Sequence, residues 1–389
     1  MKTLLQENKA WIHETWDKID AKMQKVCIRS RDKLPCIAWD NVHDDHSETQ
    51  PSYWTNGFWP GMMWLMYLGT GNEEYKTTAV RGEELLDKAL ENYKVLHHDV
   101  GFMWHISSVA NYRITGNKAS CNKGLYLAST LFSRYNIEGR YIRAWNNWSE
   151  KAFDLDRTRT IIDCMMNIPL LYWASNEIKD ERFKKVAMAH ADTTLRDHIR
   201  EDGSVQHMVT HDIVTGEKVK IGDFPGQGYA EDSSWSRGVS WAVYGFAISY
   251  VHTKEQRYLD AAIKTADHFI REVKKTDYLP VVDFYAPAKP VYYDASSGMI
   301  TACGLIEIAK ALGGEQGKYY LNEAIKLLKA ADAHFCDYDH DHDALVHKST
   351  GSYPRLPNWM DTVEVPWIFG DFYFVEAMLK LKGCSFMMW

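Results

Sequence analysis

Two kinds of predicted helix alternate along the chain. The first kind is amphipathic, as in the stripe Tyr258, Ala262, Ala266, Phe269 and Val273, whose members recur three and four residues apart. Comparable stretches follow short polar turns at 79–90, 186–199, 261–273 and 324–335, and a weaker copy begins at residue 115. Each of these helices should cover a core with one face and present the other to solvent.

The segments that precede these helices are apolar on nearly all sides and rich in Gly, Ala and Ser. They cover 57–66, 161–174, 236–250 and 295–311. A helix that is hydrophobic all round is buried among other helices, so these segments should form an inner layer. A last pair is predicted from the two ends of the chain, at 5–27 and 371–381.

This repeat predicts an all-α fold, an (α/α)6 barrel of two concentric helical rings that forms a single domain over 1–389. An open solenoid of the same units is the alternative. The barrel is favoured because the end repeats have no polar outer face and because the apolar last helix needs a partner. One segment, 205–220, alternates β-favouring residues around Thr215-Gly216-Glu217, which predicts a small β-hairpin on the rim of the barrel.

Charge and composition narrow the class of partner. The net charge is −7 and the basic residues are scattered among acids, which argues against a nucleic-acid or anionic-membrane partner. The 15 Trp and 22 Tyr exceed what a core needs, and stacking on sugar rings would use such an excess, although core packing is its commoner use.

We find no signal peptide and no apolar run of about 20 residues that could span a membrane. The seven cysteines are widely spaced without a Cys-x-x-Cys motif, which favours buried thiols in a reducing cytoplasm over disulfides or a zinc site.

Two aspartates are the strongest candidates for chemistry. Asp163 lies in an apolar run between Ile162 and Cys164, where an ionised carboxylate is costly unless it is paired or kept neutral. A neutral carboxyl group suits a proton donor, whereas an aspartate that satisfies a helix end in the core is the structural alternative. Asp99 precedes a predicted helix, and capping that helix is its structural alternative. Glycosidic chemistry generally needs two such carboxyl groups in different environments.

Other polar and aromatic residues lie near the predicted starts of the inner helices. Trp54 and Trp241 could stack on a sugar or pack in the core. Arg237 offers a planar cation for a carboxylate, with an ion pair to a nearby aspartate such as Asp232 as the alternative. The aspartate-rich run at 337–343 lacks the Gly and Glu of a calcium loop, and His97-His98-Asp99 is too compact to hold a metal alone.

Several motifs together resemble the unsaturated glucuronyl hydrolases of glycoside hydrolase family 88. They run in collinear order from Trp54 to near the C-terminus and include Trp54-Thr55-Asn56-Gly57-Phe58-Trp59, His98-Asp99-Val100-Gly101-Phe102, Arg159-Thr160-Ile161-Ile162-Asp163-Cys164 with Asn167-Ile168-Pro169-Leu170-Leu171, the segment 233–245, and Asp294-Ala295-Ser296-Ser297. The resemblance implies an (α/α)6 barrel that removes a 4,5-unsaturated uronic acid from the non-reducing end of a lyase-generated, glycosaminoglycan-type oligosaccharide.

The resemblance also implies roles for individual residues. Asp163 donates a proton to C4 and then helps water to add at C5, while Asp99 holds substrate hydroxyls and helps to keep Asp163 protonated. The positions that resemble substrate contacts are Trp54, His98, His207, Gln227, Arg237, Trp241 and Tyr353. The family implies no metal or organic cofactor, and we expect a monomer or a homodimer whose partner is the unsaturated oligosaccharide.

One departure and three alternatives stay open at this point. Relatives that accept sulfated sugars carry a Ser-x-x-Ser-x-Lys patch in a late loop, and this chain has Tyr353-Pro354-Arg355-Leu356-Pro357-Asn358-Trp359 there instead. The alternatives are a rhamnogalacturonan-type unsaturated galacturonyl hydrolase, a barrel isomerase similar to the sugar 2-epimerases, and a glycan-binding barrel without catalysis.

Overall fold

The computed structural model describes residues 1–146, 158–219, 226–355 and 357–389. Within these residues, six inner helical segments alternate with six outer helices. The inner segments are α3 (Phe58–Thr70), α5 (Val100–Trp104) continued by the π-helical turn η4 (His105–Val109) and α6 (Ala110–Thr115), α9 (Pro169–Ile178), α11 (Ser236–Thr253), α13 (Ala295–Leu312) and α15 (Ile368–Leu381). The outer helices are α4 (Glu73–Leu86), α7 (Lys118–Phe132), α10 (Glu181–Asp197), α12 (Gln256–Val273), α14 (Gly314–His334) and α2 (Lys9–Arg29), which follows the short α1 (Lys2–Glu7).

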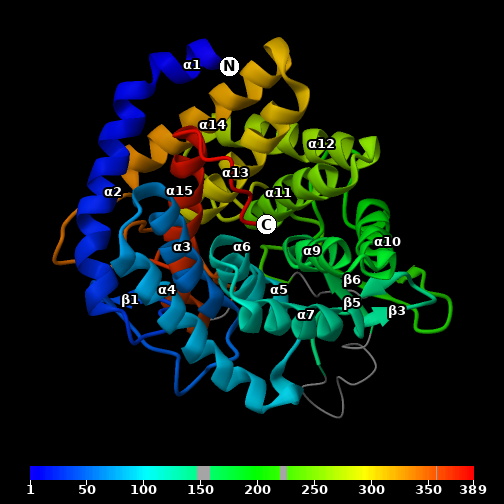
Figure 1. Ribbon diagram of the computed structural model, residues 1–389. Helices are drawn as coiled ribbons and strands as arrows, with labels where there is room; N and C mark the ends of the chain where they lie inside the picture. The colour runs from blue at the N-terminus through cyan, green and yellow to red at the C-terminus, as the bar shows by residue number, and fades with distance from the viewer. Residues whose placement is uncertain (147–157, 220–225, 356) are drawn as a thin grey trace.

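The inner ring is closed by its last helix. Helix α15 packs against α3, the first inner helix, and against α2, which belongs to the outer ring. Helices α11 and α13 continue the inner ring, and each packs on the outer helix that follows it in sequence. Figure 1 shows the helices arranged around the molecule with the C-terminus in the middle. The prediction of a closed (α/α)6 barrel is therefore confirmed, and the open solenoid is wrong.

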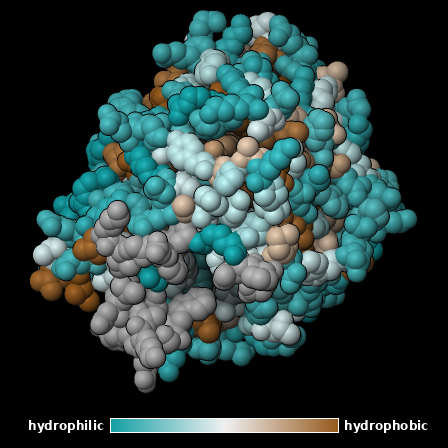
Figure 2. Space-filling model, turned by 180° about the vertical axis from the view of Figure 1, so that it is seen from behind, coloured by the Kyte–Doolittle hydropathy of each residue, from teal (hydrophilic) through white to brown (hydrophobic). Residues whose placement is uncertain are grey.

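The burial of the helices follows the two predicted patterns. Every residue of α13 from Ala295 to Ala309 is buried, whereas α12 buries the predicted stripe from Tyr258 to Val273 and exposes its other face. Helix α13 is long and apolar enough to cross a membrane by length and composition, but 83% of it is buried inside the barrel. The face turned away from the viewer in Figure 1 is mostly hydrophilic, with hydrophobic residues in small separate groups (Figure 2).

Polar turns begin several outer helices, as the repeat predicts. The side chains of Asn72, Asn117 and Asp180 accept hydrogen bonds from backbone N–H groups in the first turns of α4, α7 and α10. These bonds satisfy donors that have no partner within a helix. The polar turns thereby fix where each outer helix starts.

Short strands lie among the loops of the barrel. The strands are β1 (Ala38–Trp39), β2 (Val42–His43), β3 (Tyr135–Asn136), β4 (Tyr141–Ile142), β5 (Arg159–Ile161), β6 (Met208–His211) and β7 (Lys218–Val219). Strands β6 and β7 pair antiparallel, which confirms the predicted hairpin, and β5 pairs with β6 to extend it to three strands. The remaining short helical turns are η1 (Trp54–Gly57), η2 (Asp87–Glu91), η3 (Tyr93–Val95), η5 (Ile162–Met166), η6 (Lys274–Thr276) and η7 (Pro357–Thr362).

The expected inner helix at 161–174 is wrong at its start. Residue Ile161 ends strand β5, residues Ile162–Met166 form the 3₁₀ turn η5, and the α-helix begins only at Pro169. An apolar run of this length fits a buried strand as well as a buried helix, and Pro169 favours the first turn of a helix. This break places Asp163 on a tight turn instead of inside a regular helix.

Candidate active site

Asp99 and Asp163 come from two neighbouring inner segments. Asp99 is the residue before α5, and Asp163 lies in η5. The close approach of these segments depends on Gly101, because a Cβ at this position would lie 2.4 Å from the Cα of Asn167. Only glycine therefore allows α5 to pack on the turn that carries Asp163.

Asn167 ties the two segments together. Its side-chain oxygen accepts a hydrogen bond from the backbone N–H of Phe102 (2.7 Å), and its Nδ2 donates to Oδ1 of Asp99 (3.0 Å). Nδ2 also lies 3.4 Å from the backbone oxygen of Asp163, one turn earlier in the chain. Asn167 is fully buried, so it holds the carboxyl group of Asp99 in a fixed position.

Asp99 is the carboxyl group whose proton affinity the site raises. Burial first, and then the negative charge of Asp163, raise the pKa of Asp99 to about 8, against the opposing effects of Asn167 and Arg134. His97 and His98 lie 3.4 Å and 3.5 Å from its oxygens, but burial lowers the pKa of His97 to about 4 and that of His98 well below 6.5. Both imidazoles are therefore neutral at pH 7, and the raised pKa of Asp99 favours the protonated form of its carboxyl group.

The expectation that Asp99 helps to keep Asp163 protonated stays a prediction. The charge of Asp163 contributes to the raised pKa of Asp99, because two buried carboxyl groups resist joint ionisation. Asp163 has a different neighbour, the imidazole of His207.

His207 points one ring nitrogen at Asp163. Its Nδ1 accepts a hydrogen bond from the backbone N–H of Gln227 (3.0 Å), which places the proton of the neutral ring on Nε2. Nε2 lies 3.3 Å from Oδ2 of Asp163, and Trp235 packs against the ring with a centroid distance of 4.4 Å. His207 is therefore in close contact with the Asp163 carboxyl group, although the two atoms form no hydrogen bond.

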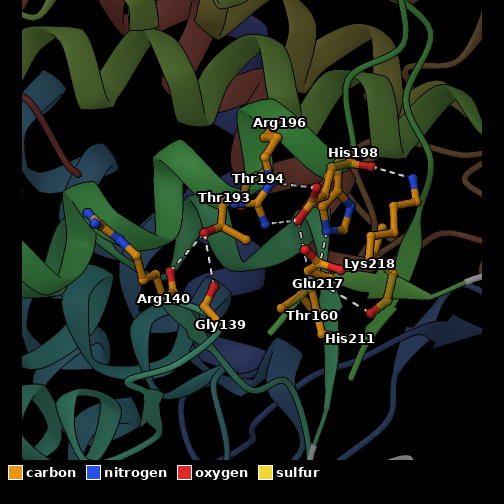
Figure 3. Close-up of polar contacts among 12 residues, drawn as sticks. Gly139, Arg140, Thr160, Thr193, Thr194, Arg196, His198, His211, Glu217 and Lys218 are labelled. Carbon is orange, nitrogen blue, oxygen red and sulfur yellow. Dashed lines mark hydrogen bonds and ion pairs between the residues drawn. The ribbon is translucent and has the colours of Figure 1, made fainter. Parts of the chain in front are cut away.

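Strand β5, which leads into Asp163, is fixed to α10 by a set of buried polar contacts (Figure 3). The hydroxyl of Thr160 lies 2.9 Å from Nε2 of His198, and Nε2 of His211 lies 3.1 Å from Oδ2 of Asp197. Asp197 also accepts two hydrogen bonds from Arg196. Because β5 and β6 are both anchored in this way, the turn η5 has little freedom to move Asp163.

Two adjoining cavities open at the site and share Tyr53 and Trp54. The larger has a volume of about 710 Å³, and its lining includes His97, Asp99 and Trp145. The smaller has a volume of about 210 Å³, and its lining includes Gln227, Arg237, Trp359, Trp367 and Phe369. Trp54 thus lines both cavities, where an aromatic face can stack on a sugar ring.

Arg237 and Gln227 hold the late loop that bounds the smaller cavity. The guanidinium of Arg237 donates to Oδ2 of Asp294 (2.8 Å) and to the backbone oxygens of Thr350 and Gly351 (2.6 Å each). Gln227 donates through Nε2 to the oxygen of Gly351 (2.6 Å). The alternative of an ion pair was correct for Arg237, but its partner is Asp294 and not Asp232.

The remaining predicted substrate contacts lie at different depths. His98 is fully buried behind Asp99, and Trp241 is fully buried against Phe102 and Tyr373. Neither residue lines the two cavities in this conformation. Tyr353 lies beside Tyr229 and Tyr292 and lines a separate pocket of about 440 Å³.

Sequence reasoning missed the roles of Tyr53, Arg134, Trp145 and Asn167. Asn167 could have been found, because it follows Asp163 by four residues in an otherwise apolar run and a buried amide needs partners. Arg134 could not, because its contribution depends on a contact between distant segments.

The contact between Gly101 and Asn167 yields a prediction. We expect Gly101→Ala to lower kcat/KM by about 100-fold, because an added Cβ must push Asn167 and α5 apart and a displacement of about 1 Å can cost that much. Steady-state rates on the substrate proposed below measure the effect. Gly298→Ala is the matched control, because the nearest atoms to its Cβ would belong to side chains, Pro280 at 3.0 Å and Leu327 at 3.8 Å, and not to the backbone. Equal rates for the two variants would contradict the role of the close approach.

Comparisons with known proteins identify relatives of the whole chain. No family model matches the chain. The chain is 33% identical to the unsaturated glucuronyl hydrolase of Bacillus sp. (strain GL1) over 333 residues, which cover 85% of this chain and 86% of that protein. It is 32% identical to the unsaturated glucuronyl hydrolase of Formosa agariphila over 335 residues, 85% of this chain and 80% of that protein.

Solved structures give the same result. The crystal structure of the Bacillus sp. GL1 enzyme superposes with a TM-score of 0.86 at 28% identity, covering 95% of this chain and 97% of that one. An unsaturated glucuronyl hydrolase from Streptococcus agalactiae superposes with a TM-score of 0.81 at 25% identity, covering 96% and 94%. The chain therefore belongs to the unsaturated glucuronyl hydrolases of glycoside hydrolase family 88.

Proposed function

We propose that this protein removes a 4,5-unsaturated uronic acid from the non-reducing end of glycosaminoglycan-type oligosaccharides produced by lyases. The observation that carries the proposal is the buried carboxyl group of Asp99, whose pKa is raised beside Asp163 and which lines, with Trp54, a cavity of about 710 Å³. A relative that is 29% identical over 94% of this chain, from Streptococcus pneumoniae, is an unsaturated chondroitin disaccharide hydrolase. A solved relative at 28% identity is complexed with dGlcA-Glc-Rha-Glc.

The reaction begins with proton transfer to carbon. The substrate is a vinyl ether, because the ring oxygen is attached to C5 of the C4=C5 double bond. Asp163 protonates C4, and the positive charge that develops is shared by C5 and the ring oxygen. Water adds to C5 as Asp163, now a carboxylate, takes a proton from it. The product is a hemiketal at C5, and no bond between sugar and enzyme forms.

Collapse of the hemiketal completes the cleavage. Opening of the ring leaves a ketone at C5 and a hemiacetal at C1, which expels the remaining sugar as an alcohol and becomes an aldehyde. One water is consumed overall. Asp163 returns to its starting state, so the same group serves as acid and then as base.

The uronate carboxylate explains how Asp163 acquires its proton. A substrate anion bound near the pair adds a second negative charge, which raises the proton affinity of both carboxyl groups. Asp163 thereby binds the proton that it delivers to C4. His207, with Nε2 3.3 Å from Asp163, supports the carboxylate form that takes the proton from water.

We propose that the protein acts in the cytoplasm. All seven cysteines lie in the part of the chain that the structure describes, and all are free thiols. Free buried thiols are typical of proteins in a reducing compartment.

The proposal is tested with an unsaturated chondroitin disaccharide. We expect the ultraviolet absorbance of the conjugated ene-acid to decay in the presence of the protein, because hydration removes the double bond. A pectin-derived unsaturated disaccharide is the matched control and should decay more slowly. Faster decay of the pectin sugar would assign the protein to the galacturonyl group, and binding without decay of either would contradict catalysis.

A further inference from the structure

A second cluster of polar side chains lies outside the pair of aspartates, in the loop between α2 and η1. This loop contains the hairpin β1–β2 and carries Cys36, Asp44 and His46. One potential ligand atom from each residue lies within 4.8 Å of the others. Their spacing matches no zinc motif, and the hairpin turn is what brings Cys36 back to Asp44 and His46.

The carboxylate of Asp44 is already oriented. Its Oδ1 accepts hydrogen bonds from the backbone N–H groups of Cys36 (2.7 Å) and Ile37 (3.1 Å). Its Oδ2 lies 3.6 Å from Nε2 of His46. A carboxylate that is held through one oxygen and presents the other is the arrangement found where outer hydrogen bonds position a metal ligand.

The other two side chains are largely enclosed. Cys36 is only 2% exposed. Nδ1 of His46 is buried and has no hydrogen-bond partner among the described residues. A buried nitrogen without a partner is costly, so a ligand that reached the imidazole would recover this energy.

We propose that Cys36, Asp44 and His46 bind one divalent ion of the zinc class. One sulfur, one nitrogen and one oxygen donor form a set that suits Zn²⁺ or Co²⁺ and disfavours Mg²⁺ and Ca²⁺, which prefer oxygen alone. A thiolate and a carboxylate together balance the charge of a divalent ion. Binding releases the thiol proton to solvent, and water supplies the fourth ligand of a tetrahedral site.

The ion would act on the wall of the active-site cavity. The ring of His46 packs edge-on against Tyr53 with a centroid distance of 5.1 Å. Tyr53 and Trp54 line both cavities of the site. Fixing His46 therefore fixes the segment that presents Trp54, so the ion is a positioning element and takes no part in the reaction.

Cobalt tests the proposal through a signal that only a thiolate ligand gives. We expect the metal-free protein to bind one equivalent of Co²⁺ with a thiolate-to-cobalt charge-transfer band in the near ultraviolet, and Zn²⁺ to abolish that band. Cys36→Ser should remove the band. His46→Ala and Asp44→Asn should weaken binding by at least about 10-fold. Asp44→Asn keeps an oxygen for the two backbone N–H groups and so preserves the loop.

Two controls separate this cluster from other ligands. Cys384→Ser removes a partly exposed thiol and should leave the band unchanged. His98→Ala alters the second group of potential ligands, His97, His98 and Asp99, which contains no sulfur, and should also leave it unchanged. A wild-type protein without the band, or a band that persists in Cys36→Ser, overturns the proposal. If Cys36→Ser does not fold, unchanged cobalt affinity in both Asp44→Asn and His46→Ala overturns it equally.

Discussion

Asp163→Asn should lower kcat on the unsaturated disaccharide by about 1,000- to 10,000-fold, because general acid–base catalysis contributes about 10²–10⁴ and in the proposed reaction this residue serves in both steps. The amide keeps the shape of the side chain but can neither give nor take a proton at neutral pH. Substrate affinity should change little, since Trp54 and the cavity walls are untouched. The decay of ene-acid absorbance measures kcat, and calorimetric titration of the inactive variant measures affinity.

Asp232→Asn is the matched control for Asp163→Asn. Asp232 is exposed and lies in the segment that leads into α11, so its substitution should leave kcat within about twofold of wild type. The Asp163 variant should unfold at the same temperature as wild type or a higher one, because it removes a charge that opposes Asp99. A variant that folds normally and keeps a tenth of the wild-type rate would show that another group protonates C4.

The helical architecture followed from periodicity because each helix buries a face that sequence alone marks. The stripe from Tyr258 to Val273 is buried as predicted, and the all-round apolar segment at 295–311 became the inner helix α13. The segment at 161–174 was harder, because strand β5 and the turn η5 are as apolar as a helix. Pairing of β5 with β6, a contact between distant segments, decided its conformation.

The candidate site was predictable in its residues but not in its electrostatics. Asp163 stood out as a carboxyl group in an apolar run, and Asp99 stood out as a carboxyl group at the start of a predicted helix. The raised pKa of Asp99 depends on its burial and on the nearby charge of Asp163, and both follow from the tertiary structure. Arg237 shows the same limit, because its partner Asp294 lies 57 residues away.

Asp99→Asn should change the pH dependence of the enzyme as well as its rate. The pKa of Asp99, about 8, belongs to the interacting pair, so kcat/KM of the wild type should fall as pH rises through about 8, where the pair loses its last proton. The substitution leaves Asp163 without a second carboxyl group. The fall of kcat/KM at alkaline pH should therefore begin at a lower pH than in the wild type. The rate at pH 7 should fall by about 100-fold or more. A variant whose kcat/KM still falls near pH 8 would contradict the interaction between Asp99 and Asp163.

Stability should change in the opposite direction to activity in Asp99→Asn. Because the pKa of Asp99 is about 8 in the folded state and about 3.9 in the unfolded chain, the wild type loses stability as pH rises between these values. The amide that replaces the carboxyl group carries no charge and still accepts the hydrogen bond from Asn167. The variant should therefore be more stable than wild type by as much as about 5 kcal/mol at pH 8, and the difference should vanish near pH 4. Urea unfolding across this range measures it, and a difference that does not grow with pH would place the buried proton elsewhere.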